Sequence, residues 1–115
     1  MVSRPVVAFQ IRGRDAKKLT EFYVRMFEWE MDGDNPLGVT FGHSGPGGPE
    51  VLAGTILPGD PAVLIYVQVA DLGASLARAV ELGGKRVQEP FDVPNGPTVA
   101  QVSDPEGNLV GLVQL

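Results

Sequence analysis

The stretch VSDPEGNLVGLVQL, residues 102–115, predicts a strand, a tight turn and a second strand. In the turn, Pro105 presets the first backbone dihedral angle and Gly107 lets the chain close. Gly111 stands in the middle of the second strand, where a glycine weakens the strand and leaves an empty place on one face. The residue type at this position, and at the positions that neighbour it on other strands, is the main indication of function in the sequence.

The chain has the composition of one globular domain. Its 115 residues are 43% hydrophobic and 20% charged, and the absence of cysteine excludes disulfides and thiolate chemistry. The net charge of −5 argues against nucleic acid as a partner, and the basic clusters at residues 12–18 and 85–86 are interpreted as solvated faces. No apolar run reaches about 18 residues and no signal core follows Met1, so we expect no membrane association and a cytoplasmic location.

The second half of the chain shows the order strand, helix and three strands. Alternating apolar residues at 63–69 predict the first strand, and Asp71 is the expected N-cap of a helix. Apolar residues at helical spacing follow, and the pair Gly83-Gly84 ends the helix. A strand at 85–88, a loop at 94–97 and the closing hairpin complete this half.

The first half repeats this order at an offset of 56 residues. A strand at 5–12 precedes Asp15, a second N-cap, and an apolar helical stripe from Ala16 to Phe27. Three short strands are predicted next, at residues 29–31, 39–42 and 51–57. The repeat indicates an α+β fold of duplicated β-α-β-β-β modules in one domain, residues 1–115. Module one covers about 5–57, a linker 58–61, and module two about 62–115.

Three segments carry a family resemblance: AKKLTEFY (16–23), VADLGASLARAVELGG (69–84) and DPEGNLVGLV (104–113). In this order and spacing the chain resembles the vicinal oxygen chelate superfamily, which includes glyoxalase I, bleomycin-resistance proteins and extradiol dioxygenases. The resemblance implies a single glyoxalase-like domain. It also implies that the strands of the two modules bend into a cup-shaped, partly open barrel that holds the site.

Members of this superfamily that use a metal place His, Gln or Glu on four strands and chelate one divalent ion. The matching positions in this sequence are Ala8, Leu64, Gly111 and a fourth position near Ala53. None of these residues can bind a metal ion. We therefore predict no metal and no cofactor, and a metal-free small-molecule-binding protein of the glyoxalase and bleomycin-resistance type.

Strand parity predicts which side chains line the cup. Polar groups among apolar walls are typical of small-molecule pockets, and the acidic net charge favours a cationic ligand such as a bleomycin-like glycopeptide. No residue is assigned a catalytic role. The predicted lining residues are Ala8, Gln10, Leu64, Tyr66, Gln68 and Gly111.

Two other functions stay open at this point. One is a metal-dependent lyase, epimerase or dioxygenase with relocated ligands, drawn from His43, Gln10, Glu50 and Gln68. The other is an accessory domain that serves a partner protein. We also expect a homodimer, because the resemblance implies that strands from two chains complete each cup. Apolar positions such as Trp29 and Phe41, which one small core cannot fully bury, agree with a dimer.

Overall fold

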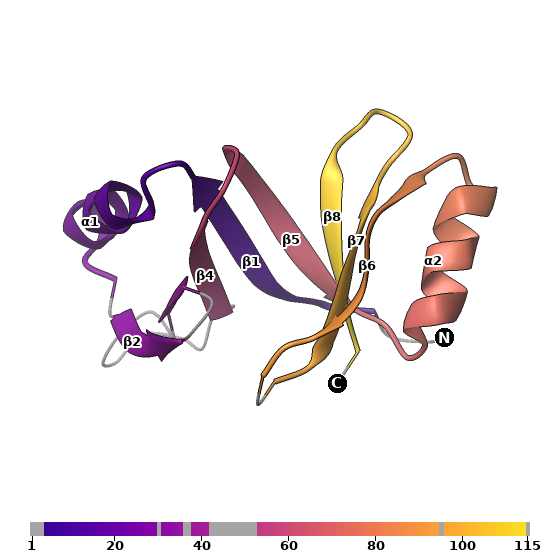
Figure 1. The fold of residues 1–115 in the computed structure, drawn as a ribbon, viewed down its shortest axis with the longest axis horizontal. Helices are drawn as coiled ribbons and strands as arrows, with labels where there is room; N and C mark the ends of the chain where they lie inside the picture. Colours follow the sequence, from indigo (N-terminus) through magenta and orange to yellow (C-terminus); the bar gives the residue numbers. More distant parts are fainter. Residues whose placement is uncertain (1–3, 30, 36–37, 42–52, 95, 115) are drawn as a thin grey trace. The chain divides into compact units, whose positions relative to one another are not determined.

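The computed structural model describes residues 4–29, 31–35, 38–41, 53–94 and 96–114. The chain divides into two compact units. We call residues 8–63 the N-terminal module, and residues 1–7 with 64–115 the C-terminal module. The order strand, helix, three strands occurs twice along the chain (Figure 1), which confirms the α+β class and the duplication. Neither helix of the described residues is long and apolar enough to cross a membrane.

The N-terminal module packs one helix against a sheet. The strand order is β2-β3-β4-β1, in which β1 and β4 run parallel and the other neighbours antiparallel. Parallel neighbours need a long connection, and the helix with the two intervening strands supplies it. The elements are β1 (Val6–Gly13), α1 (Ala16–Phe27), β2 (Met31–Asn35), β3 (Gly38–Phe41) and β4 (Ala53–Pro58).

Helix α1 begins where the sequence predicts. The Asp15 carboxylate accepts a hydrogen bond from the backbone N–H of Lys18 at 3.1 Å, which satisfies a free donor of the first turn. The module's core contains Ile11 of β1 and Ile56 of β4, which are 6% and 0% exposed. Partly buried residues pack around them: Phe9, Ala16, Leu19, Tyr23, Val24 and Trp29.

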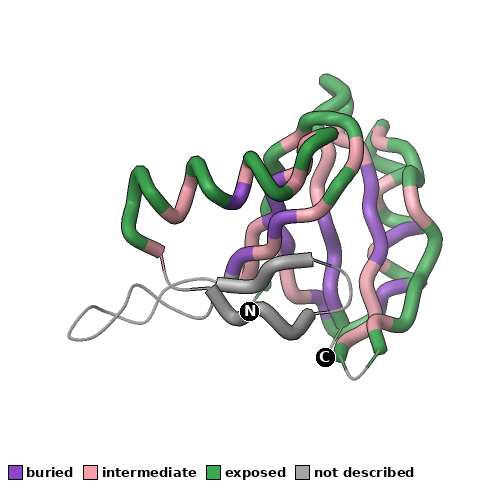
Figure 2. Tube along the Cα trace, turned by 60° about the vertical axis from the view of Figure 1, so that its left-hand side comes forward, coloured by how far each residue is buried: buried purple, intermediate pink, exposed green. Residues whose placement is uncertain are grey.

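The apolar stripe of α1 is wider than the surface that this core covers. Phe22, Met26 and Phe27 belong to the predicted stripe, yet they are 58%, 62% and 51% exposed. Figure 2 shows helices that are largely exposed or intermediate, and within α1 the buried position is Thr20. One shoulder of the helix therefore presents large apolar side chains to solvent.

The strand predicted at residues 29–31 is wrong for Trp29. Helix α1 ends at Phe27, and Glu28 adopts a left-handed conformation with φ 56°. Beyond this turn the Trp29 ring stacks on the ring of Tyr23, with centroids 5.5 Å apart and planes at 12°. Trp29 thus packs in the core of its own module, and the next strand, β2, begins only at Met31.

The C-terminal module has the same arrangement. The strand order is β5-β8-β7-β6, with β5 and β8 parallel and the other pairs antiparallel. Strand β8 therefore has a neighbour on both sides. The elements are β5 (Ala62–Gln68), α2 (Leu72–Glu81), β6 (Lys85–Asp92), β7 (Thr98–Ser103) and β8 (Leu109–Gln114).

Both ends of α2 follow the predicted signals. The Asp71 carboxylate accepts a hydrogen bond from the N–H of Ala74 at 2.9 Å. At the other end Gly83 has φ 97°, and the N–H of Gly84 donates to the carbonyl of Ala79 at 2.8 Å, as in a Schellman motif. A Cβ at position 84 would lie 2.5 Å from the carbonyl oxygen of Ser103. The second glycine therefore lets the end of α2 approach β7 closely.

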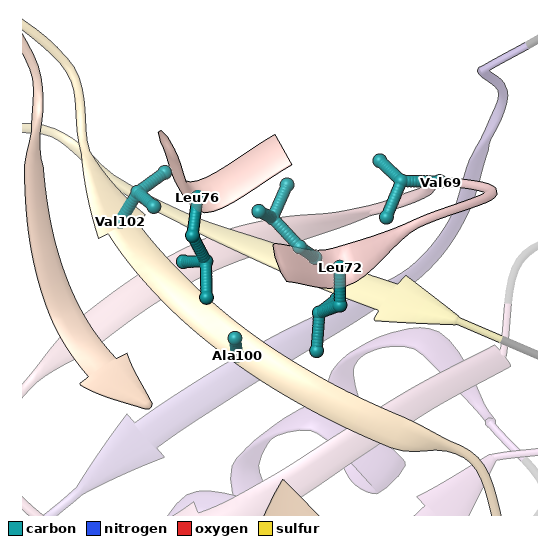
Figure 3. Close-up of a cluster of buried hydrophobic side chains, with 6 residues drawn as sticks. Val69, Leu72, Leu76, Ala100 and Val102 are labelled. Atoms are coloured by element: carbon teal, nitrogen blue, oxygen red, sulfur yellow. The ribbon is translucent and has the colours of Figure 1, made fainter. Parts of the chain in front are cut away.

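The core of the C-terminal module lies between α2 and the sheet. Figure 3 shows Leu72 and Leu76 on α2 beside Ala100 and Val102 of β7. Leu76 is 0% exposed. Burying a leucine side chain fully contributes about 1.5–3 kcal/mol, so these contacts fix the helix on the sheet.

Strand β5 is buried differently from the predicted apolar alternation. Val63 and Ile65, expected on the apolar face, are 72% and 45% exposed. Leu64 and Tyr66, on the other face, are 2% and 8% exposed. Only the later part of the alternation, from Val67 onward, joins the core beneath α2. The apolar face that the alternation marks along residues 63–69 is therefore buried only in its second half.

The closing hairpin is held by one carboxylate. Asp104 accepts hydrogen bonds at 2.9 Å from the side-chain amide of Asn108 and from the backbone N–H groups of Asn108 and Glu106. Gly107 has φ 88°, and its N–H donates to the Asp104 carbonyl. The hydrogen bonds, led by that of the Asn108 side chain, hold the pKa of the Asp104 carboxyl below its ordinary value.

Candidate ligand-binding site

The predicted lining residues fall into two groups. Ala8 and Gln10 lie on β1, in the N-terminal module. The remaining residues belong to the C-terminal module, where β5 carries Leu64, Tyr66 and Gln68 and β8 carries Gly111. In each module, these residues lie on the face of the sheet opposite the core that packs against the helix.

In the N-terminal module the register brings the predicted positions of two strands together. Ala8 lies opposite Ala53 on β4, and Gln10 lies opposite Thr55. Directly opposed residues share a face of the sheet, so these positions form one patch. Gln10 is the buried polar member, at 8% exposure.

In the C-terminal module Gly111 lies at the centre of a row of three residues. Tyr66 of β5 is opposite Gly111 of β8, which is opposite Gln101 of β7. The Tyr66 ring rests on Gly111. A Cβ built at position 111 would clash with three atoms of the ring, and its distance to the ring's Cζ would be 2.5 Å. The empty place left by the glycine is thus filled by the ring from the neighbouring strand.

Tyr66 reaches across β8 to a strand that is not its neighbour. The side-chain amide of Gln101 donates a hydrogen bond to the Tyr66 hydroxyl at 3.0 Å. Both side chains are buried, at 7% and 8% exposure. Buried polar groups of this kind need partners, and this bond fixes the ring over Gly111.

The sequence analysis did not identify Gln101 as a member of this site. Its only signal is alternation, because it stands between the core residues Ala100 and Val102. That pattern predicts a face but not a partner. Conversely, the relocated metal ligands considered at residues 43 and 50 lie outside the described residues.

A family model, the glyoxalase-like domain, matches residues 7–113. The match extends over nearly the entire chain and includes both modules. The chain belongs to the glyoxalase-like domain family. It is thereby a member of the vicinal oxygen chelate superfamily, as the three sequence motifs indicated.

Several solved structures have the same fold as this chain. A hypothetical protein from Bacillus halodurans C-125 is 17% identical, with a TM-score of 0.66 over 99% of this chain and 96% of its own. A glyoxalase/bleomycin resistance protein/dioxygenase superfamily member from Vibrio splendidus 12B01 is 16% identical, with a TM-score of 0.65 over 98% and 100%. Methylmalonyl-CoA epimerase from Mycobacterium tuberculosis is 15% identical, with a TM-score of 0.62 over 95% and 86%.

These identities establish the glyoxalase-like fold and not a reaction. The comparison with curated protein sequences found no significant match. The chemistry must therefore be argued from the residues of this glyoxalase-like chain.

The divalent metal ion that many glyoxalase-like proteins use does not fit the residues present at the matching positions. Ala8 and Leu64 carry no donor atom, and Leu64 is 2% exposed. At Gly111 the space that a ligating side chain would need is occupied by the Tyr66 ring. Among the residues that the structure describes, His, Cys, Asp and Glu do not cluster in groups of three or more that could hold a metal.

The strand register also sharpens the fourth position. Thr55 lies opposite Gln10 as Gly111 lies opposite Tyr66, and the repeat offset of 56 residues relates these pairs. Thr55 is therefore the equivalent of Gly111 in the N-terminal module, two residues beyond Ala53. A lone threonine hydroxyl does not replace the carboxylate or imidazole ligands that such metals prefer.

Proposed function

We propose that this glyoxalase-like chain is a metal-free small-molecule-binding protein of the glyoxalase and bleomycin-resistance type. The observation that supports the proposal best is the Tyr66 ring on Gly111. Metal-using members need a ligating side chain at that position, and here an aromatic ring takes its space. The apolar residues at Ala8 and Leu64 agree with this reading.

The proposed lining suits binding rather than catalysis. Within the C-terminal module it combines an aromatic ring, Tyr66, with the amides of Gln68 and Gln101. Amides orient a ligand by hydrogen bonds, but they cannot act as general bases near neutral pH. The net charge of −5 favours a ligand with positive charge. A bleomycin-like glycopeptide is therefore the first probe to try.

Metal content tests the first half of the proposal. Freshly purified, untagged protein is incubated with Fe, Mn, Ni or Zn ions, exchanged into metal-free buffer and analysed by elemental mass spectrometry. We expect below about 0.1 equivalent of each ion, because structural or catalytic sites retain near one equivalent. Retention of one equivalent that is lost in His43→Ala or Glu50→Gln would overturn the proposal in favour of an enzyme with relocated ligands.

Calorimetric titration with metal-free bleomycin tests the second half. We expect binding that Gln68→Leu weakens about tenfold, since one lost polar contact in a pocket typically costs about 1.4 kcal/mol. Arg78→Ala is the matched control, because Arg78 is exposed on α2. Failure of this and of neutral aromatic probes to bind would count against a ligand-binding role and favour an accessory domain.

Three further statements stay predictions. A homodimer and a cytoplasmic location rest on the family resemblance and on composition alone. The absence of a nucleic-acid or membrane partner rests on the acidic net charge and on the apolar patterning.

A further inference from the structure

Helix α1 presents two large apolar side chains beside two basic ones on its solvent face. Phe22 and Met26, one turn apart, are 58% and 62% exposed. Lys18 precedes Phe22 by four residues and Arg25 follows it by three, and side chains at these spacings are neighbours on a helix. Both cations are exposed, and among the described residues no ion pair includes either of them. Phe22 therefore lies between two solvent-exposed positive charges.

Helix α2 holds the equivalent place in its own module but has a different solvent face. Its positions at the offset of 56 residues are likewise exposed, so packing on the sheet does not dictate which residues stand there. Its charges neutralise each other, because the Arg78 guanidinium lies 3.0 Å from the Glu81 carboxylate. The aromatic ring between two cations is thus specific to α1. The corresponding positions are Lys18 and Ala74, Phe22 and Arg78, and Arg25 and Glu81.

We infer that this face of α1 binds an amphipathic helix of a partner protein in which acidic side chains flank the apolar ones. The apolar side chains of the partner pack against Phe22 and Met26. Its carboxylates pair with Lys18 and Arg25, which stand directly beside the ring. Helix α1 covers the face of its sheet opposite the predicted lining residues, so the inference is independent of the proposed small-molecule site.

The charge of the chain favours a short acidic helix over a nucleic acid or a lipid surface. The net charge of −5 repels an extended polyanion beyond the first contacts. Binding of nucleic acid depends on many phosphate contacts, and membrane attachment needs a larger apolar face or a polybasic segment. A helix with two or three carboxylates meets the two cations at close range and avoids most of this repulsion.

The size of the surface predicts weak, reversible binding. A helix of 12 residues is about 18 Å long. Its exposed face offers less than the roughly 800 Å² per partner that standard interfaces bury. We therefore expect a dissociation constant of about 10–100 µM for a single helix of this kind.

A designed peptide tests the surface directly. The probe is a fluorescein-labelled peptide of about 15 residues, long enough to form a helix, with leucine at helical spacing and glutamate beside it. Fluorescence anisotropy is measured while the full chain is titrated at low salt. Lys18→Glu and Arg25→Glu should each weaken binding about fivefold, and Phe22→Ser about tenfold. Glu21→Gln should tighten binding about twofold, because the Glu21 carboxylate lies beside both cations at helical spacing and competes for them.

Lys85→Glu on β6 is the matched control. It makes the same change in net charge at an exposed residue of the other module, and it should weaken binding less than about twofold. A second peptide, with lysine in place of each glutamate, should bind the double variant Lys18→Glu/Arg25→Glu about tenfold more tightly than the wild type. Circular dichroism verifies that each variant keeps its helices.

Four results would overturn the inference. The acidic peptide could fail to bind at up to about 1 mM protein. Lys85→Glu could weaken binding as much as Lys18→Glu does. Vesicles of phosphatidylglycerol, or a single-stranded oligonucleotide, could bind more tightly than the peptide with the same dependence on Arg25, which would assign the face to a lipid surface or a nucleic acid. Sedimentation velocity could show that Phe22→Ser dissociates a dimer, in which case a second copy covers the face.

Discussion

Replacing Gly111 by alanine adds one methyl group at the point where the Tyr66 ring rests on β8. The new Cβ would lie 2.5 Å from Cζ of the ring, whereas carbon atoms in contact are about 3.5–4.0 Å apart. The ring must therefore move by about 1 Å. It cannot swing away freely, because the Gln101 amide holds its hydroxyl at 3.0 Å and the side chain is 8% exposed.

Three effects combine in the expected cost. Overpacking a filled interior costs about 1–3 kcal/mol. Weakening the buried bond between Gln101 and Tyr66 adds about 1 kcal/mol. Replacing a strand glycine by alanine returns about 0.5–1 kcal/mol through the unfolded chain. We expect Gly111→Ala to lower the free energy of unfolding by about 2 kcal/mol, with the overpacking term dominant.

A double-mutant cycle isolates the contact. Urea unfolding is followed by far-UV circular dichroism for wild type, Gly111→Ala, Tyr66→Ala and the double variant. Removing the ring removes the clash, so Gly111→Ala in the Tyr66→Ala background should be neutral or stabilising by up to about 1 kcal/mol. The two sites should couple by about 2–3 kcal/mol. Gly73→Ala on α2 is the control glycine: the nearest atom to its added Cβ is 3.6 Å away, and we expect a small gain in stability.

Additive effects would refute the reasoning. If the cycle closes to within about 0.5 kcal/mol, the ring does not rest on Gly111 in solution. The same conclusion follows if Gly111→Ala is as stable as the wild type. Either result would also weaken the argument that an aromatic ring has replaced a metal ligand at this position.

Three further predictions concern the C-terminal module. Because the pKa of Asp104 is lowered in the fold by Asn108, its stabilising contribution is present above the unfolded pKa and is lost as pH falls through the folded one. Urea midpoints measured on acidification should therefore fall more for wild type than for Asp104→Asn. Asp71→Ala removes the cap bond to Ala74 and should cost about 1 kcal/mol in urea unfolding. Leu76→Ala, at a fully buried site, should cost about 2–5 kcal/mol in the same assay.

Local signals in the sequence predicted the ends of helices well. Asp15 and Asp71 cap α1 and α2 as expected, because a capping carboxylate bonds to backbone groups only three residues away. The paired glycines end α2 for the same local reason. The duplication was also predictable, since each module repeats the same order of short-range signals.

Burial was harder to predict, because it depends on which surface another element covers. The apolar stripe of α1 includes Phe22 and Met26, yet the module's core leaves them exposed. On β5 the polar-looking position Tyr66 is buried, while Ile65 is half exposed. Alternation identifies two faces of a strand but not which one is covered.

The candidate site was predictable by position and not by contact. Gly111 was recognised as an empty place, and parity put Tyr66 on the relevant face. That the ring would fill the glycine's space depends on a strand register between residues distant in sequence, Tyr66 and Gly111. The partner amide of Gln101 adds a third strand to the same contact. No local sequence pattern encodes a contact between residues of three different strands.

The parallel strand pairs have a consequence for how the chain is made. Ala8 pairs with Ala53, and Tyr66 with Gly111, so each parallel pair joins residues about 45 positions apart. A ribosome adds about 5–20 residues per second, so the first strand of each module waits roughly 2–9 seconds before its partner exists. During that interval β5 lacks the neighbour that pairs with Tyr66. The two intervals, one in each half of the chain, are therefore the stages of synthesis at which a chaperone would have most to protect.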